Sequence, residues 1–234
     1  MWTPRAFCVL AFGLAWLGTA HSSNADPTGT IVGHVRYLGT RVIAPIRVPP
    51  SAAMPCGKTQ PSQALIVGKD KSLANAVLSV DGLPDGAPAA PTEVSITQKA
   101  CVFEPHVVAA RIGSRLTFIN TDVCLHNVHL IAGGVTLGNI AMPIQGQQSK
   151  LPISVLSKAG SVHFKCDVHS WMDGYVYVFG HPHFAVSDRS GAFRIEGVPP
   201  GTHELRVQHE LIGGVSRQVT VPAGGEANID IDLK

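Results

Sequence analysis

The most informative segment of this chain reads Phe164-Lys165-Cys166-Asp167-Val168-His169-Ser170-Trp171-Met172-Asp173-Gly174. Within it a cysteine, a histidine and a methionine follow one another at intervals of three residues. An earlier segment, Ile119-Asn120-Thr121-Asp122-Val123-Cys124-Leu125-His126-Asn127-Val128, places another histidine 40 residues before that cysteine. A thiolate, two imidazoles and a weak thioether form the ligand set of a copper site that transfers single electrons. The sequence therefore predicts one copper ion, alternating between Cu(I) and Cu(II), with the ligands His126, Cys166, His169 and Met172.

Each predicted ligand lies where a strand-like run meets a loop. Ser161–Lys165 leads directly into Cys166, and His169 and Met172 lie on the loop that follows. His126 belongs to a different strand-like run, which would tie the ion to a rigid scaffold. The alternatives are that these residues are ordinary core side chains, or that they bind zinc, which also accepts cysteine and histidine. Because a thioether is a soft ligand, Met172 favours copper over zinc.

Composition predicts an all-β protein. The 234 residues include 24 glycines and 17 prolines, and apolar residues rarely recur at the spacing of an amphipathic helix. Strand-like runs begin with Gly29–Tyr37 and include Ala64–Gly68 and Ser149–Val155; between residues 92 and 180 they suit a Greek-key sandwich. A Pro-rich stretch after the first run predicts an irregular connection. With 18 basic and 16 acidic residues, the chain shows no footprint for nucleic acid and no polybasic run for a membrane surface.

The first 25 residues have the features of a signal peptide. Met1–Arg5 supplies positive charge, residues 6–20 are apolar, and cleavage after Ala20 or Ala25 would satisfy the small-residue rule. The apolar run is short for a helix that spans a bilayer, so we expect removal rather than anchoring. The mature chain is therefore expected to be periplasmic, without a membrane span.

Four cysteines follow the signal peptide: Cys56, Cys101, Cys124 and Cys166. Exported proteins can form disulfides, and we expect Cys56 and Cys101 to pair because both lie in turn-like surroundings. The alternative is that both are unpaired and buried as small apolar residues. Cys124 would then be a free thiol near a predicted ligand, and we expect it to pack inward.

Residues 117–130 and 161–178 resemble the cupredoxin (type 1 blue-copper) family, and within it the amicyanin- and plastocyanin-like members. The resemblance rests on the segment His126-Asn127-Val128-His129 and on the short Cys-x-x-His-x-x-Met loop, and it extends over about Thr92–Gly180. It implies a Greek-key sandwich that holds one copper ion and exchanges electrons with other proteins.

The resemblance also implies a role for each residue. His126, Cys166 and His169 would be equatorial ligands and Met172 the axial ligand. Asn127 would hydrogen-bond to the Cys166 loop and hold the two ligand segments in register. In this family the histidine of the ligand loop reaches the surface within an apolar patch, through which the electron leaves. The candidates for this patch are His169, Trp171, Met142 and Pro143.

A second resemblance covers the C-terminal part. Ser187-Asp188, Gly191-Ala192-Phe193 and Val198-Pro199-Pro200-Gly201-Thr202 resemble the carboxypeptidase-regulatory, transthyretin-like sandwich. That module usually begins with a strand like Gly29–Tyr37, so residues 26–82 and 181–234 are expected to form one discontinuous sandwich; the alternative is a separate C-terminal appendage. The expected division is a signal peptide (1–25), N-terminal strands with a linker (26–91), a cupredoxin domain (92–180) and a smaller second sandwich (181–234).

These features together predict a periplasmic type 1 copper protein that carries single electrons between transient redox partners. No catalytic triad, phosphate-binding loop or carboxylate pair stands out, so we expect no enzyme activity. The alternative is an envelope protein that binds or delivers copper without transferring electrons. Only Met54, Met142 and Met172 follow the signal peptide, which gives no methionine-rich donor surface. An auxiliary metal site at His181 and His183 would lack a third local ligand.

Overall fold

The computed structural model describes residues 27–84 and 92–234, and in these residues almost all regular structure is β-strand. The predicted all-β class is confirmed. The predicted signal peptide lies outside the described residues, as does part of the predicted linker. No helix in the described part of the chain is long and apolar enough to cross a membrane.

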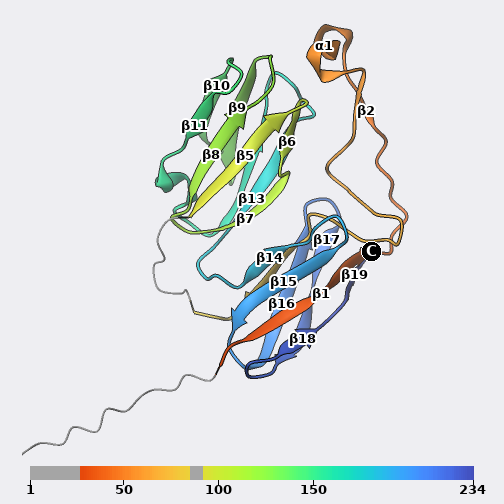
Figure 1. Ribbon diagram of the computed structural model, residues 1–234, viewed down its shortest axis with the longest axis vertical. Coiled ribbons are helices and arrows are strands. Elements are labelled where there is room, and N and C mark those ends of the chain that lie inside the picture. Colours follow the sequence, from red (N-terminus) through yellow and green to blue (C-terminus); the bar gives the residue numbers. More distant parts are fainter. Residues whose placement is uncertain (1–26, 85–91) are drawn as a thin grey trace, which may run out of the picture.

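Figure 1 shows two sandwiches, and the predicted ligands lie on β9 (His126–Ala132) and on the loop between β12 (Gly160–Lys165) and β13 (Asp173–Phe179) of the first. One of its sheets has the strand order β10 (Val135–Met142), β9 (His126–Ala132), β12 (Gly160–Lys165), β13 (Asp173–Phe179) and β7 (Val107–Arg111). The other sheet has the order β11 (Gln148–Lys150), β8 (Arg115–Asn120), β5 (Glu93–Lys99) and β6 (Val102–Glu104). β13 pairs in parallel with β7, and β5 with β8, while the other neighbours are antiparallel.

Aromatic packing between the two sheets positions the end of β12, from which Cys166 emerges. Phe103, Phe118 and Phe164 are fully buried and pack edge to face, with ring centroids 5.0 to 6.0 Å apart. Gly174 of β13 lies opposite Phe164 in the ladder. A Cβ at Gly174 would lie 2.4 Å from Cζ of that ring, so glycine is needed for the ring to close over the strand.

The second sandwich joins the two ends of the chain. Its first strand, β1 (Gly29–Tyr37), pairs antiparallel with β15 (Ala192–Val198) and in parallel with β18 (Glu226–Asn228) and β19 (Ile231–Leu233). The facing sheet has the order β14 (Phe184–Val186), β4 (Val77–Asp81), β16 (Gly201–His209) and β17 (Gly213–Val221). β1, which precedes the first sandwich in the chain, thus pairs with strands that follow that sandwich.

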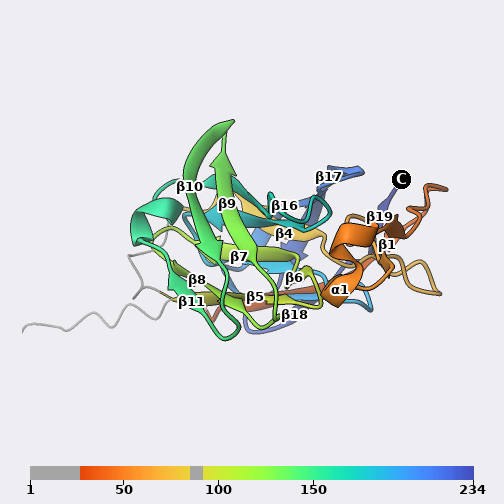
Figure 2. The ribbon, with the colours of Figure 1, turned by 90° about the horizontal axis from the view of Figure 1, so that it is seen from above.

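The chain between β1 and β4 leaves the second sandwich and runs beside the first (Figures 1 and 2). It is irregular, as the prolines predict, apart from short elements: β2 (Ile46–Arg47), a 3-10 turn (Pro50–Ala52), α1 (Ala53–Cys56) and β3 (Thr59–Gln60). The strand predicted at Ala64–Gly68 is wrong, because only Val67 forms an isolated bridge there, to Leu73.

Two further differences from the predicted strands have local causes. The strand predicted at Ser149–Val155 ends at Lys150, because Pro152 lacks an amide hydrogen and precedes a 3-10 turn, Ile153–Leu156. β10 was not predicted at all. Most of its side chains are exposed or half-buried, so it lacks the apolar alternation by which a strand is recognised.

Candidate metal centre

Three predicted ligands converge at one end of the first sandwich. Sγ of Cys166 lies 3.9 Å from Nδ1 of His126 and 3.8 Å from Nδ1 of His169. The two Nδ1 atoms are 3.0 Å apart. His126 is the first residue of β9, whereas Cys166 and His169 lie on the loop after β12. All three side chains are buried.

These separations fit one small cation. Nitrogen and thiolate ligands bound at about 2.0 and 2.3 Å in a trigonal plane lie about 3.7 Å from each other, and two such nitrogens lie about 3.5 Å apart. The two sulfur–nitrogen distances of 3.9 and 3.8 Å come close to the first value, and the nitrogen–nitrogen distance of 3.0 Å is shorter than the second. One thiolate and two imidazoles in this arrangement form a donor set that suits copper.

Met172 closes the ligand loop. Its carbonyl accepts a hydrogen bond from the backbone N–H of Cys166 at 2.9 Å, and its own N–H donates to the carbonyl of His169 at 2.9 Å. Its side chain is fully buried in the same core cluster as Cys166. The backbones of the three loop residues therefore hold one another in place.

Asn127 joins the two ligand segments. Its Oδ1 accepts the backbone N–H of Asp167 at 2.6 Å, and its Nδ2 donates to Oδ2 of Asp167 at 3.0 Å. The hydrogen bond predicted from Asn127 to the Cys166 loop is thus present. A salt bridge from Lys165 lowers the pKa of Asp167, and His129 and Asn139 also contact this carboxylate.

Sequence reasoning missed Asp122. Its Oδ2 lies 3.0 Å from Nε2 of His126, and its two oxygens accept the backbone N–H groups of Ala100 and Cys101 at 2.7 and 2.8 Å. A carboxylate that accepts a hydrogen bond from the N–H of one ring nitrogen leaves the other nitrogen free to bind a metal ion. The only signal in the sequence is an aspartate four residues before a predicted ligand.

Burial sets the protonation of the two histidines. It lowers the pKa of His126, against the opposing effect of Asp122, and it also lowers the pKa of His169. Both rings are therefore neutral at neutral pH, which is the form of imidazole that binds metal ions.

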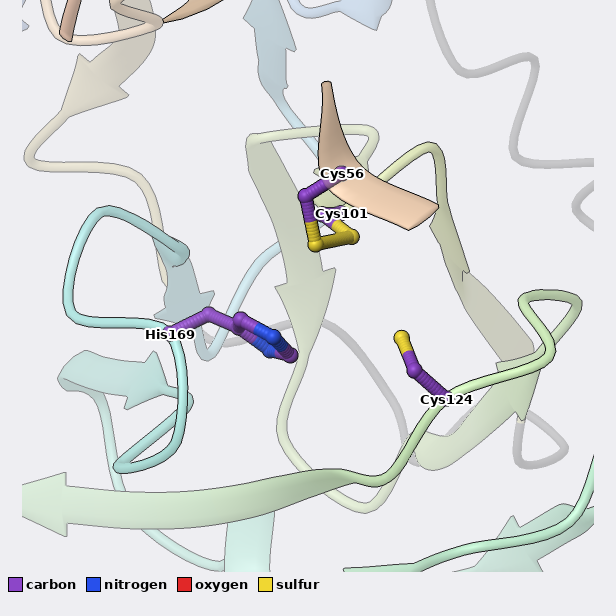
Figure 3. A group of neighbouring side chains, drawn as sticks. All are labelled: Cys56, Cys101, Cys124 and His169. Atoms are coloured by element: carbon purple, nitrogen blue, oxygen red, sulfur yellow. A yellow bond between two sulfur atoms is a disulfide. The ribbon is translucent and has the colours of Figure 1, made fainter. Parts of the chain in front are cut away.

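The disulfide predicted between Cys56 and Cys101 is present, with the two Cα atoms 5.4 Å apart. It fastens α1 to the turn between β5 and β6. Cys124 is a free thiol that is half-buried against the core, as expected, and burial raises its pKa. Figure 3 shows the disulfide, Cys124 and His169 as neighbours.

The surface patch expected around His169 does not form as predicted. His169 is only 5 % exposed and Met142 is fully buried, so neither belongs to a surface patch. Met142 is the last residue of β10 and points into the core, and the disulfide and Cys124 lie against His169. Of the other two candidates, Trp171 is half-buried and Pro143 is exposed.

The two histidines considered for an auxiliary metal site, His181 and His183, stack with their ring centroids 5.9 Å apart. Nδ1 of His181 accepts the backbone N–H of His183.

Two protein families match parts of the chain. Residues 90–187 match the model of copper binding proteins of the plastocyanin/azurin family, and residues 175–234 match that of the carboxypeptidase regulatory-like domain. No curated protein matches the chain.

Solved structures that are similar include a reduced amicyanin mutant, with 23 % identity, a TM-score of 0.34, and coverage of 44 % of this chain and 98 % of that one. A purple cupredoxin from Nitrosopumilus maritimus has 21 % identity and a TM-score of 0.31, covering 36 % and 98 %. A copper-containing nitrite reductase from Thermus scotoductus SA-01 has 22 % identity and a TM-score of 0.32, covering 42 % and 25 %. Two parts of this chain are therefore similar to known families: residues 90–187 to copper binding proteins of the plastocyanin/azurin family, and residues 175–234 to the carboxypeptidase regulatory-like domain.

Proposed function

We propose that this protein is an exported, mononuclear type 1 copper protein that carries single electrons between redox partners in the periplasm. The observation that supports this most is the convergence of Cys166 Sγ with Nδ1 of His126 and of His169, within a region that matches a copper-binding family. These residues would hold one copper ion per chain, with Met172 as the fourth ligand. When bound, copper supplies a one-electron Cu(II)/Cu(I) couple.

The surrounding residues keep the ligands in one arrangement. Burial excludes water, and the backbone bonds among Cys166, His169 and Met172 restrain the loop. Asn127 fixes this loop to β9. Because electron transfer is fast when ligands move little, such restraint suits a carrier. A catalytic metal site instead keeps a coordination position open to substrate, whereas this donor set is buried.

The partners would dock on exposed apolar side chains close to the ligands along the chain or across the β9–β10 ladder. Leu125 precedes His126 and is 45 % exposed, and Val168 precedes His169 and is 50 % exposed. Ile144 is 66 % exposed and lies two residues after Met142, which is the ladder partner of His126. Small apolar contacts of this kind suit the weak, brief encounters of redox proteins.

The proposal is tested by adding one equivalent of Cu(II) to the protein purified from the periplasm and recording visible and electron paramagnetic resonance spectra. We expect an intense blue thiolate-to-copper band and a narrow hyperfine splitting. Cys166→Ala should abolish both, since the band requires the thiolate. Val168→Ala, a change in an exposed residue of the same loop, should retain both. A colourless bound ion, or a band that survives in Cys166→Ala, would contradict the proposal.

The alternative is an envelope protein that binds or delivers copper without an electron-transfer role. The two are separated by voltammetry of the copper-loaded protein and by its rate of electron self-exchange. A carrier shows a reversible one-electron wave and fast exchange. A delivery protein would transfer Cu(I) to a chelator without such a wave.

A further inference from the structure

A second group of soft ligands lies beside His169. Sγ of Cys56, Cys101 and Cys124 and a ring nitrogen of His169 all lie within 4.8 Å of one another (Figure 3). A cysteine binds a metal ion as the thiolate. Cys56 and Cys101 are therefore not available as ligands while the disulfide joins them. We propose that reduction of the Cys56–Cys101 disulfide creates a second metal site for a thiolate-binding d10 cation, Cu(I) or Zn(II). Its ligands are Cys56, Cys101, Cys124 and His169, which it shares with the first site.

The chemistry of this step balances with a dithiol as the reductant. The dithiol gives two electrons and two protons to the disulfide, whose S–S bond breaks, and the dithiol itself becomes a disulfide. Cys56 and Cys101 become free thiols. Together with Cys124 they then release their protons to solvent as they bind the cation.

The positions of the residues allow such a site. Sulfur atoms bound to one tetrahedral ion at about 2.3 Å lie about 3.8 Å from each other. Once the disulfide is broken, side-chain rotation can bring Cys56 and Cys101 to such a separation, since their Cα atoms are 5.4 Å apart. Three thiolates and one imidazole form a set used by structural zinc sites, and thiolates also select Cu(I).

Hydrogen bonds other than the disulfide hold Cys56 next to Cys101. Nε2 of Gln60 donates to the carbonyl of Cys56 and, at 3.0 Å, to the carbonyl of Ala100. Gln60 is 7 % exposed, so water competes little for these bonds. The segment that carries Cys56 therefore keeps a link to the turn that carries Cys101 when the disulfide is reduced.

The other ligands have independent supports as well. Asp122 accepts the N–H of Cys101 at 2.8 Å, and Nε1 of Trp171 donates to the carbonyl of Cys101 at 2.9 Å. Nδ2 of Asn120 donates to the carbonyl of Cys124 at 3.1 Å. Because Trp171 and His169 lie on one loop, these bonds connect all four ligand positions. The second site is therefore preorganised before any cation arrives.

This inference goes beyond the electron-carrier function and is tested without it. The full mature chain carrying Cys166→Ala lacks the thiolate of the first site. It is reduced with a dithiol, freed of the reductant without oxygen, and titrated with Cu(I) in competition with a coloured chelator. A parallel titration uses Zn(II). We expect one equivalent to bind at least about 100-fold more tightly in the reduced form than in the disulfide form, because two thiolates become available.

Matched variants in the same background locate the site. Cys124→Ser should weaken binding to the reduced protein by at least about 100-fold, because one thiolate is lost. Val123→Ala, at a neighbouring position that is 71 % exposed, should leave the affinity unchanged. Equal affinities of the reduced and disulfide forms, or an unchanged affinity in Cys124→Ser, would overturn the proposal, as would the absence of binding by both cations. The two titrations also show which of the two cations the site prefers.

A second measurement needs no substitution at the new site. Alkylation of the reduced Cys166→Ala protein, followed by mass spectrometry, reports which thiols the cation covers. Protection of Cys56, Cys101 and Cys124 by one equivalent supports the site. Labelling of any of them at the rate seen without the cation would contradict it. Circular dichroism of the same samples shows whether the reduced chain remains folded.

Discussion

At the scale of single residues, Asn127 links the two ligand segments. Its side-chain amide makes two hydrogen bonds to Asp167, one with the backbone N–H and one with the carboxylate. It also donates to Oδ1 of Asn139 at 2.8 Å. Asn127 is 8 % exposed, so water cannot easily replace these bonds. Asn139 stands on β10 at the edge of the sheet, and its Nδ2 donates to Oδ2 of Asp167 at 3.0 Å.

We predict that Asn127→Ala lowers the free energy of unfolding by about 1–3 kcal/mol, because the N–H of Asp167 loses its acceptor in a partly buried position. Asn139→Ala should cost less, since Asp167 keeps the bond from Asn127. Urea denaturation of the copper-free proteins measures both values. Equal effects of the two substitutions would show that Asn127 has no special role.

At the scale of elements, the pairing of β12 with β13 determines where Cys166 lies. Gly174 allows Phe164 to lie flat against β13, two residues before Cys166. A Cβ at this position would also lie 2.3 Å from the carbonyl oxygen of His106, a backbone atom that cannot move freely.

Gly174→Ala should therefore destabilise the protein by about 1–3 kcal/mol or more, through overpacking, and should disturb the ligand loop. Gly138→Ala on β10 is the matched control, because its Cβ would make only an ordinary contact, 3.9 Å from Leu130 Cδ1. Thermal unfolding and the intensity of the blue band after copper loading measure the two effects. The expectation fails if both variants resemble the unsubstituted protein.

At the scale of the whole molecule, a buried ion pair connects the two sandwiches. His106 lies between β6 and β7, and its Nε2 contacts Glu210 in the turn between β16 and β17; the two side chains are 1 % and 8 % exposed. Its Nδ1 donates to the carbonyl of Asp173 at 2.8 Å. Burial opposes the charge on His106, but the hydrogen bond and charge of Glu210 outweigh it and raise the pKa.

A raised histidine pKa in the folded state gives a definite sign to the pH dependence. The contribution of this pair is fully present below the pKa of an unfolded histidine, about 6.5, and is lost as the pH rises through the folded pKa. His106→Gln should thus cost up to about 3 kcal/mol at pH 6 and less at pH 9. Urea denaturation across this range measures the difference. His34→Gln is the control: it removes an exposed pair with Asp230 and should have little effect on stability at any pH. A destabilisation by His106→Gln that does not depend on pH would contradict a charged His106–Glu210 pair.

The sequence by itself determined the all-β class and the grouping of Cys166, His169 and Met172. These three residues lie close together in the sequence, on one loop. Strands with one buried face show an alternation of apolar and polar residues directly in the sequence. The disulfide and the Asn127 bond were also predicted, the first from the turn-like surroundings of Cys56 and Cys101 and the second from a family resemblance.

Only the tertiary structure decided what surrounds those ligands. The segment with Cys56 lies against His169, so the expected surface patch is absent, and Asp122 reaches His126 through a loop without a periodic pattern. β10 could not be recognised because its faces are not separated into apolar and polar. His106 meets Glu210 across 104 residues. Such contacts depend on how whole sheets pack, and local periodicity carries no information about the distance between residues so far apart in the chain.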